Sequence, residues 1–327
     1  MYICLKTTMK NYYLLFGTLL LLQLACFGQT LPEILTQEHQ LIKGTNIHLV
    51  PPPSFSASDN FKGFQDPNDP YSMLMVVEIP GPFSEVTEGF KAELMAPRGM
   101  QLLEKQSVTI GPYDGYLLQV DQAAGEFIFS KHILIYGDEK ASTLLNAVFL
   151  KTDDKLGKAL RESIMTTYID TELNVNPRAA LQYQVDETQG KLLFHSVIGN
   201  AMLFNRDLKT PTESTDKAAL IVDQSFNEVE VNDREAFCLE RLAKFNDPYT
   251  LNTSNGKGIE AIEIDGLPGY ELRATSTTGE EELLQVILFT EGGGYYILVG
   301  TYQKGYNEAY QDIRRVMMTF QRKSNEE

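Results

Sequence analysis

The two halves of this chain resemble each other in the pattern of their apolar residues. The similarity runs without gaps at a shift of 153 residues, through a strand-like run, a turn, a second strand-like run and a helix. Identical residues are few, but apolar character agrees at nearly every inward position. The matching segments are 133–136 with 286–289, 144–149 with 297–302, and 160–166 with 313–319. The pattern predicts two tandem copies of one module.

The similarity continues upstream with one residue of slippage. Gly115 aligns with Gly269, and each is predicted to lie in a turn that opens a strand, because Asp-Gly and Pro-Gly both favour turns. The repeat then covers about 44–168 and 199–321. The other aligned positions are 73–77 with 218–222, Phe90 with Phe237, and 44–47 with 199–202.

Each copy is predicted to contain two strands, a helix, three or four strands and a closing helix. Strands are expected at 101–110, 116–121, 126–136 and 143–151, and the first helix is expected to begin at Ser84. The late strands are apolar on both faces, so both faces need cover. The predicted fold class is therefore α+β, with two tandem α/β/α sandwich modules, each a largely antiparallel sheet flanked by helices.

The closing helices share a motif of arginine, two residues, an apolar residue and methionine. The motif comprises Arg161, Ile164 and Met165 in one copy and Arg314, Met317 and Met318 in the other. Together with the Gly-Tyr pairs and the strand meander, it resembles the PsbP-like superfamily, which includes photosystem PsbP, a Ran-binding import factor and bacterial DcrB. The resemblance implies a fold that docks to other proteins, and it carries no functional residue onto this chain.

The first residues have the layout of a secretory signal. Two lysines precede an uncharged stretch that is too short for a bilayer span, and cleavage is expected after Gly28. Cys26 offers a lipid-modified N-terminus as an alternative, although Gln23 stands where a lipobox has an aliphatic residue. Translation starts at either Met1 or Met9. The sequence predicts an exported protein, periplasmic or secreted, with no membrane span after cleavage.

The expected domain organisation places the boundary between the copies near residue 175, in a polar stretch. A hairpin at 181–185 could add to the second module. The assigned ranges are a signal peptide at 1–28, an N-terminal segment at 29–43, module 1 at 44–170, a linker or added hairpin at 171–191, module 2 at 192–322 and a disordered tail at 323–327.

The composition argues against several functional classes. A net charge of −16 repels phosphate backbones, so nucleic-acid binding is not expected. The sequence holds no nucleophile elbow, zinc-protease motif or phosphate loop, and Asp66 and Asp69 lie among prolines that favour a turn over a calcium loop. Cys238 is predicted to be a packed apolar residue, and no cofactor or metal is predicted. The histidines, none spaced for zinc, are His39, His48, His132 and His195.

Arg161 and Arg314 recur at one helical position in both copies. An arginine in such a place suits either an anion site or a structural ion pair. The leading hypothesis is an exported, non-enzymatic interaction protein that serves a partner protein or envelope complex. A small-ligand or lipid carrier with a cleft within or between the modules is the alternative, and a hydrolase is the weakest hypothesis.

Overall fold

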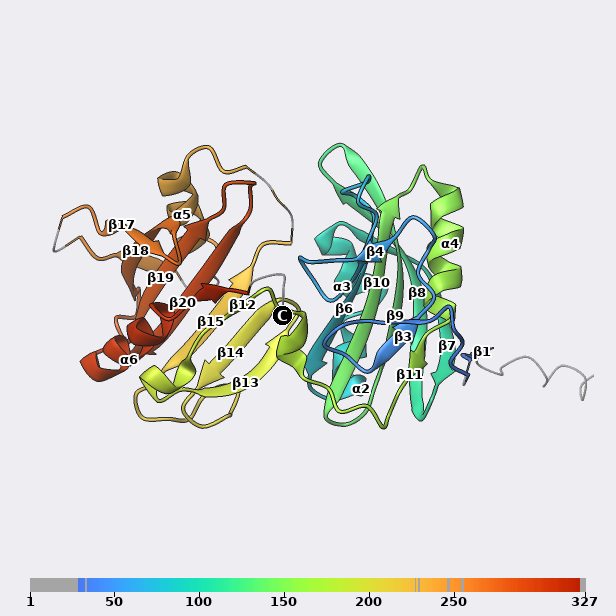
Figure 1. Cartoon of the computed structure of the whole chain (residues 1–327), viewed down its shortest axis with the longest axis horizontal. Helices are drawn as coiled ribbons and strands as arrows, with labels where there is room; N and C mark the ends of the chain where they lie inside the picture. The colour runs from blue at the N-terminus through green and yellow to red at the C-terminus, as the bar shows by residue number, and fades with distance from the viewer. Residues whose placement is uncertain are drawn as a thin grey trace, which may run out of the picture.

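The computed structural model describes residues 29–323, apart from 33, 227, 229, 246–247 and 254–255. Two large β-sheets lie side by side, one built from each half of the chain (Figure 1). The predicted signal, with Cys26, Gly28 and both start residues, falls outside the described residues. None of the helices in the described ranges is long and apolar enough to cross a membrane.

The first sheet carries most of the first module. Its strands are β1 (Gln29–Thr30), β4 (Ser56–Ala57), β5 (Gly63–Gln65), β6 (Met73–Pro80), β7 (Met100–Ile110), β8 (Tyr113–Ala124), β9 (Phe127–Gly137) and β10 (Ala141–Leu150). They lie in the order β1-β7-β8-β9-β10-β6-β5-β4, and every pair except β1 with β7 is antiparallel. The helices are α2 (Phe83–Glu88), α3 (Ala92–Met95), η1 (Ala96–Arg98) and α4 (Asp154–Met165).

The second sheet repeats this order. Its strands are β13 (Leu193–Ile198), β14 (Ala201–Asn205), β15 (Ala219–Gln224), β16 (Tyr249–Leu251), β17 (Ile259–Ile264), β18 (Leu267–Ser276), β19 (Glu281–Phe289) and β20 (Tyr295–Gln303), with helices α5 (Arg234–Leu242) and α6 (Asn307–Met317). The main path runs β13-β14-β15-β20-β19-β18-β16, and β17 also pairs with β18. In both sheets the last strand before the final helix lies between a meander and an earlier strand.

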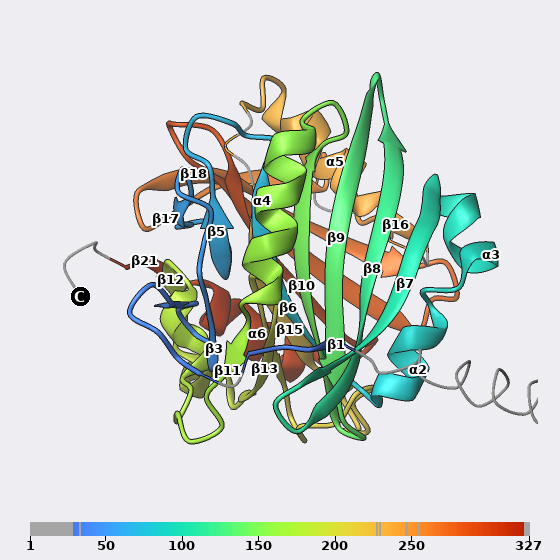
Figure 2. The ribbon, with the colours of Figure 1, turned by 90° about the vertical axis from the view of Figure 1, so that its right-hand side faces the viewer.

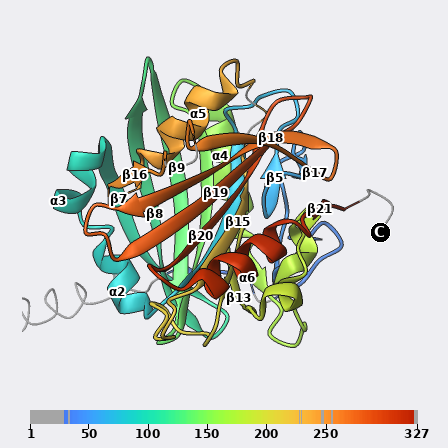
Figure 3. The same ribbon diagram turned by 90° about the vertical axis from the view of Figure 1, so that its left-hand side faces the viewer.

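The longest helices cover the outer faces of the two sheets. Figure 2 shows α4 across the first sheet, and Figure 3 shows α6 across the second sheet on the opposite side of the molecule. Leu160 of α4 packs with Leu134 and Leu145 in one core, and Ile313 of α6 packs with its own sheet. Burying one such side chain contributes roughly 1.5–3 kcal/mol, so these helices are held mainly by their apolar faces.

Short strands close each module around its final helix. The first module has a three-stranded sheet of β11 (Tyr168–Ile169), β3 (Ile47–Leu49) and β2 (Gln40–Leu41), and the second pairs β12 (Tyr183–Gln184) with β21 (Gln321–Arg322). Two 3₁₀ turns, η2 (Pro177–Ala180) and η3 (Glu187–Gly190), flank β12. In both modules the strand after the last helix pairs with a strand at the module's beginning.

These short strands change the expected domain ranges. Leu31 and Ile42 lie in the first core, so 29–43 is part of that module rather than a separate segment. Leu181 and Tyr183 lie in the second core, and β12 pairs with the C-terminal strand instead of forming a hairpin at 181–185. Lys323 donates its backbone N–H to Gln182 at 2.8 Å, so it belongs to the fold and not to the tail.

The prediction of α/β/α sandwiches is wrong. The chain is mostly β, with 43% of residues in strands and 18% in helices, and large multi-strand sheets dominate. The inner faces are apolar as expected, but the helix predicted from Ser84 is two short helices, α2 and α3. Leu94 of α3 is exposed. The helices therefore cover parts of these faces without forming continuous layers.

The two glycines predicted in turns lie inside strands. Gly115 pairs with Tyr136 in β8–β9, and Gly269 pairs with Leu288 in β18–β19. A Cβ on Gly115 would lie 2.7 Å from the Ile135 carbonyl oxygen, which leaves no room for a side chain. Both glycines are needed for close approach of the neighbouring strand rather than for a turn.

The predicted pairing of Ile135 with Leu288 is shifted by one residue. Leu288 belongs to the core under α6, whereas Ile135 lies between Leu134 and Tyr136, which belong to the core under α4. Side chains alternate along a strand, so Ile135 faces the opposite side. The β19–β20 turn holds one more residue than the β9–β10 turn, which explains the shift.

Two further sequence expectations are corrected. Residues 44–47 lead into β3 of the small sheet, whereas 199–202 form the turn into β14 of the large sheet, so these segments do not correspond. The spacing of Asn232 and Glu235 in the sequence is typical of a capping box, but Asp233 caps α5 instead, by accepting from the Ala236 N–H at 2.9 Å.

The modules touch where β6 meets β13 and where the residues before β5 meet the second sheet. Phe61 and Phe226 lie with ring centroids 6.5 Å apart, and Gln224 Nε2 donates to Asn60 Oδ1 at 3.2 Å. The Asn200 side chain also donates to the Asn60 carbonyl. These contacts join the loop before β5 to the β13–β15 edge of the second sheet.

Candidate functional site

A pocket with both polar and apolar walls opens between α4 and the first sheet. It has a volume of about 430 Å³, and we call it the α4 pocket. The residues that define it are Asp121, Ser130, His132, Phe149, Lys151, Gly157, Lys158 and Arg161. They come from β8, β9, β10 and α4, so strands distant in sequence from the helix build one site.

The floor of the α4 pocket is a hydrogen-bonded carboxylate. Asp121 is nearly buried, and its Oδ1 accepts from Ser130 Oγ at 2.5 Å. Its Oδ2 pairs with Lys151 Nζ at 2.6 Å. Since both oxygens have partners, Asp121 is compensated by local groups and adds little free charge to the pocket.

His132 is the least satisfied group of the pocket. It is 5% exposed and stacks on Phe149 with ring centroids 5.4 Å apart. Burial lowers the pKa of His132, the charge of Arg161 lowers it further, and a hydrogen bond to the Gly157 backbone acts in the opposite direction. Its Nδ1 has no hydrogen-bond partner, so the neutral ring presents Nδ1 as an unused acceptor.

Arg161 is also incompletely paired. Its Nη2 reaches Gln106 Oε1 at 3.4 Å and Glu104 Oε1 at 3.7 Å, and its Nη1 has no partner. The structure therefore places this sequence-predicted residue in the wall of a pocket, with donors left over. A guanidinium in such a position can bind a carboxylate or another oxyanion.

Arg314 lies at the same level of α6 and forms a close ion pair. Its Nε donates to both carboxylate oxygens of Glu271, at 3.0 and 3.2 Å. A second polar pocket of about 330 Å³ lies here, and Arg273, Tyr310 and Glu260 also line it. Because Arg314 is paired with Glu271 at close range, the structural ion pair describes this position in the second module.

The pocket of the second module lacks the histidine of the α4 pocket. Leu284 stands where His132 stands, since each lies under the final helix opposite a small residue, Gly300 and Ala147 respectively. Arg273 lies over the Tyr310 ring at 4.2 Å. A buried imidazole under the final helix is therefore a feature of the first module alone.

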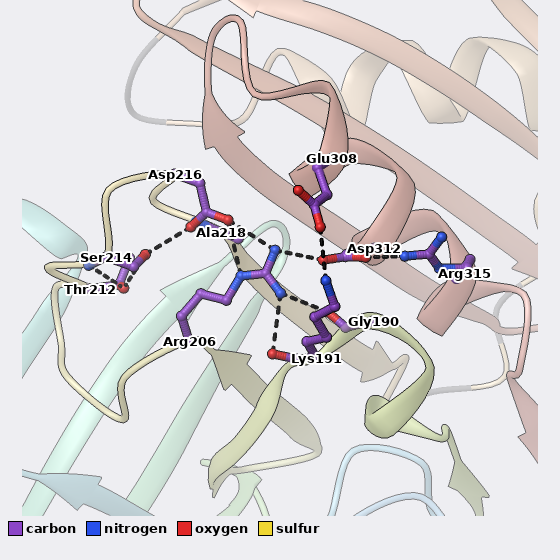
Figure 4. A network of polar contacts seen from close by, with 10 residues as sticks. All are labelled: Gly190, Lys191, Arg206, Thr212, Ser214, Asp216, Ala218, Glu308, Asp312 and Arg315. Carbon is purple, nitrogen blue, oxygen red and sulfur yellow. Dashed lines mark hydrogen bonds and ion pairs between the residues drawn. The ribbon is translucent and has the colours of Figure 1, made fainter.

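A network around Arg206 is the largest polar cluster near α6 (Figure 4). The guanidinium contacts Asp216 Oδ2 at 2.9 Å, Asp312 Oδ2 at 2.9 Å and the Gly190 carbonyl at 2.7 Å. Arg315 supplies a further partner to Asp312, which is 1% exposed. Its groups are satisfied by one another, so the network ties η3, α6 and the loop after β14 together.

The remaining sequence candidates have structural roles. His39 bonds Thr36 and the Thr166 carbonyl, and His195 bonds Ser196 and Thr210. Cys238 is fully buried, and burial raises its pKa to about 12, so it is a packed thiol. Among the described residues no group of three His, Cys, Asp or Glu side chains could hold a metal ion.

An exposed aromatic cluster lies at the tip of the β8–β9 hairpin, which reaches beyond the neighbouring strands (Figure 2). We call Tyr71, Phe127, Ile128 and Phe129 the hairpin patch. Tyr71 lies 5.3 Å from Phe127 and 6.1 Å from Phe129, measured between ring centroids. Tyr71, Phe127 and Ile128 are 41%, 44% and 51% exposed.

The loop that carries Tyr71 is held by the acidic residues once considered for calcium. Asp69 Oδ1 accepts from the Tyr71 N–H at 2.9 Å, and Asp66 Oδ1 accepts from the Asn68 N–H at 2.9 Å. These side chains complete turns, as the sequence predicted for this proline-containing segment. The aromatic ring is thereby presented from an ordered loop.

Sequence reasoning missed the α4 pocket and the hairpin patch. The signal for the pocket was a run of polar residues at inward positions of apolar strands, with Gln119 and Asp121 on one strand and Ser130 and His132 on the next. Alternation places all four on the face under α4. The patch had no local signal, because Tyr71 is far from the hairpin in sequence.

Comparison with known proteins gives only remote likenesses. No protein-family model matches the chain, and no curated protein matches it. The immunity protein TplEi of T6SS from Pseudomonas aeruginosa is 10% identical, with 87% of this chain and 96% of that chain covered and a TM-score of 0.34. A chain of the Tle4–Tli4 complex is 9% identical, with 89% and 99% covered and a TM-score of 0.33.

A Bacteroides thetaiotaomicron protein is 15% identical, with a TM-score of 0.29. The alignment covers 46% of this chain and 53% of that protein, so this chain spans about half of its length. All three TM-scores are low, and the argument on function therefore rests on the chain's own residues.

Proposed function

We propose that this chain is an exported protein that acts by binding another protein rather than by catalysis. The observation that supports the proposal is the hairpin patch, in which three aromatic rings meet at the tip of a projecting hairpin. Aromatic side chains are enriched where proteins bind one another, because they bury large area at low entropic cost. The PsbP-like resemblance and the tandem duplication remain predictions beside it.

The charges near the patch favour a partner with a basic, apolar surface. Glu126 precedes Phe127 in the hairpin, and Asp66 and Asp69 lie in the loop of Tyr71. The whole chain carries a net charge of −16. A second copy would bring like charges to the same place, whereas Lys or Arg side chains around an apolar centre would complement them.

Site-specific photocrosslinking in cells that make the chain tests this function. A photoreactive amino acid replaces Phe127, and a matched probe replaces Ile221, which is 44% exposed on the second sheet. We expect a crosslinked protein from the Phe127 position alone. The crosslinked protein is then purified, and its affinity for the full chain is measured.

Substitution of residues in the hairpin patch tests whether the patch forms the binding surface. Tyr71→Ser combined with Phe127→Ser should weaken binding of the purified partner at least tenfold, whereas Ile221→Ser should leave it within about twofold. Equal affinity of the patch variant and the wild-type chain would reject the proposal. Crosslinks only between copies of this chain would also reject it in favour of self-association.

A further inference from the structure

We propose that the α4 pocket is a binding site for a small hydroxylated monocarboxylate, a class that includes hydroxy acids and uronic acids. The site differs from the hairpin patch and does not depend on it. Two buried groups of the pocket point to a ligand, because His132 Nδ1 and Arg161 Nη1 both lack partners. Buried polar atoms are nearly always hydrogen-bonded, so two orphans lining one pocket call for a ligand that satisfies both.

An unpaired donor of Arg161 favours an anion. The Asp121 carboxylate is paired with Lys151, and Arg161 reaches Glu104 only at 3.7 Å. The charged groups around the pocket balance one another, but Nη1 of Arg161 has no partner. A ligand carboxylate can replace the long Glu104 contact and bind Arg161 through two donors.

The neutral imidazole selects a hydroxyl. In the neutral tautomer with its proton on Nε2, the unpartnered Nδ1 of His132 is an acceptor, and a ligand hydroxyl can donate to it. Phe149 and Leu103 add apolar wall to the same pocket. A volume of about 430 Å³ lies in the range of small-molecule sites and accommodates a ligand as large as a uronic acid.

The second module provides an internal control. At the places of His132 and Gly157 it carries Leu284 and Tyr310, and its arginine is paired with Glu271. The module therefore retains the helix and sheet but lacks both unsatisfied groups. If His132 and Arg161 had only a structural role that both modules share, the first module would not need their two unpartnered atoms.

Calorimetric titration of the full chain with D-glucuronate and with L-lactate tests the site. Glucose supplies hydroxyls without a carboxylate, and acetate supplies a carboxylate without a hydroxyl. We expect saturable binding of at least one hydroxylated carboxylate, and binding of glucose and acetate that is weaker by about fivefold or more, as one lost hydrogen bond predicts.

Variants then assign the binding to the pocket. Arg161→Gln should weaken binding at least tenfold and His132→Leu about fivefold, whereas Arg314→Gln should leave it within about twofold. Thermal unfolding of each variant confirms that it is folded. Failure of both glucuronate and lactate to bind would overturn the proposal, and so would equal losses for Arg161→Gln and Arg314→Gln. Neither result bears on the hairpin patch, whose partner binding is measured separately.

Discussion

Arg314 holds both carboxylate oxygens of Glu271, at 3.0 and 3.2 Å, and this bridge joins α6 to β18. The arginine at the corresponding place of α4, Arg161, has only long contacts to β7. The arginine at this helical position thus forms a close ion pair in the second module and only long contacts in the first.

This difference predicts unequal effects on stability. Arg314→Gln leaves the Glu271 carboxylate, whose side chain is 13% exposed, without its partner, and we expect a loss of about 1–3 kcal/mol in the free energy of unfolding. Arg161→Gln should cost less than about 1 kcal/mol, because no ion pair is broken at close range. Urea denaturation of both variants measures the difference, and equal costs would contradict it.

Removal of Arg206 should be far more damaging. Arg206→Met leaves Asp312 almost fully buried with Arg315 as its remaining charge partner, and frees Asp216. Breaking a buried pair from one side costs about 3–5 kcal/mol. Arg315→Gln is the matched control, because its side chain is 54% exposed, and should cost clearly less. If denaturant unfolding shows a larger loss of stability for Arg315→Gln than for Arg206→Met, this prediction is wrong.

His132 predicts a pH dependence of stability. Burial and Arg161 lower the pKa of His132 in the folded chain, so the unfolded chain takes up more protons once the pH falls below about 6.5. Stability should therefore be retained above pH 6.5 and decrease from there toward the lowered pKa. His132→Leu should flatten this decrease. Unfolding measured between about pH 5 and 7.5 tests the sign, and an unchanged slope in the variant would exclude His132 as its source.

We expect alanine to be unfavourable at Gly157, although this residue lies in a helix. Alanine normally stabilises an interior helical position by about 1 kcal/mol relative to glycine. Here a Cβ would lie 2.5 Å from Phe149 Cε2, so we expect Gly157→Ala to cost about 1–3 kcal/mol. Combining it with Phe149→Leu should recover part of that cost, whereas additive losses in thermal melts would show that the ring is not the obstacle.

The sequence alone determined where most long elements lie. Alternating and doubly apolar runs located β7 to β10 to within a few residues, because burial on a sheet imposes a period of two whatever the partner strand. The recurrence of Leu160 and Ile313 at helical spacing also located the faces of α4 and α6 that are buried. These signals are local, because the periodicity of apolar residues is visible within each segment of the sequence.

The tertiary structure decided what the local signals leave open. The shift between Ile135 and Leu288 follows from one extra residue in a turn, and the position of Gly115 follows from the approach of the next strand. Whether each arginine forms a close ion pair depends on residues far away in sequence. Arg314 has Glu271 as a close partner, whereas Arg161 has no carboxylate at close range. Whether a polar group is satisfied is a property of its neighbours in space, and a neighbour across a sheet leaves no mark on the residue's own segment.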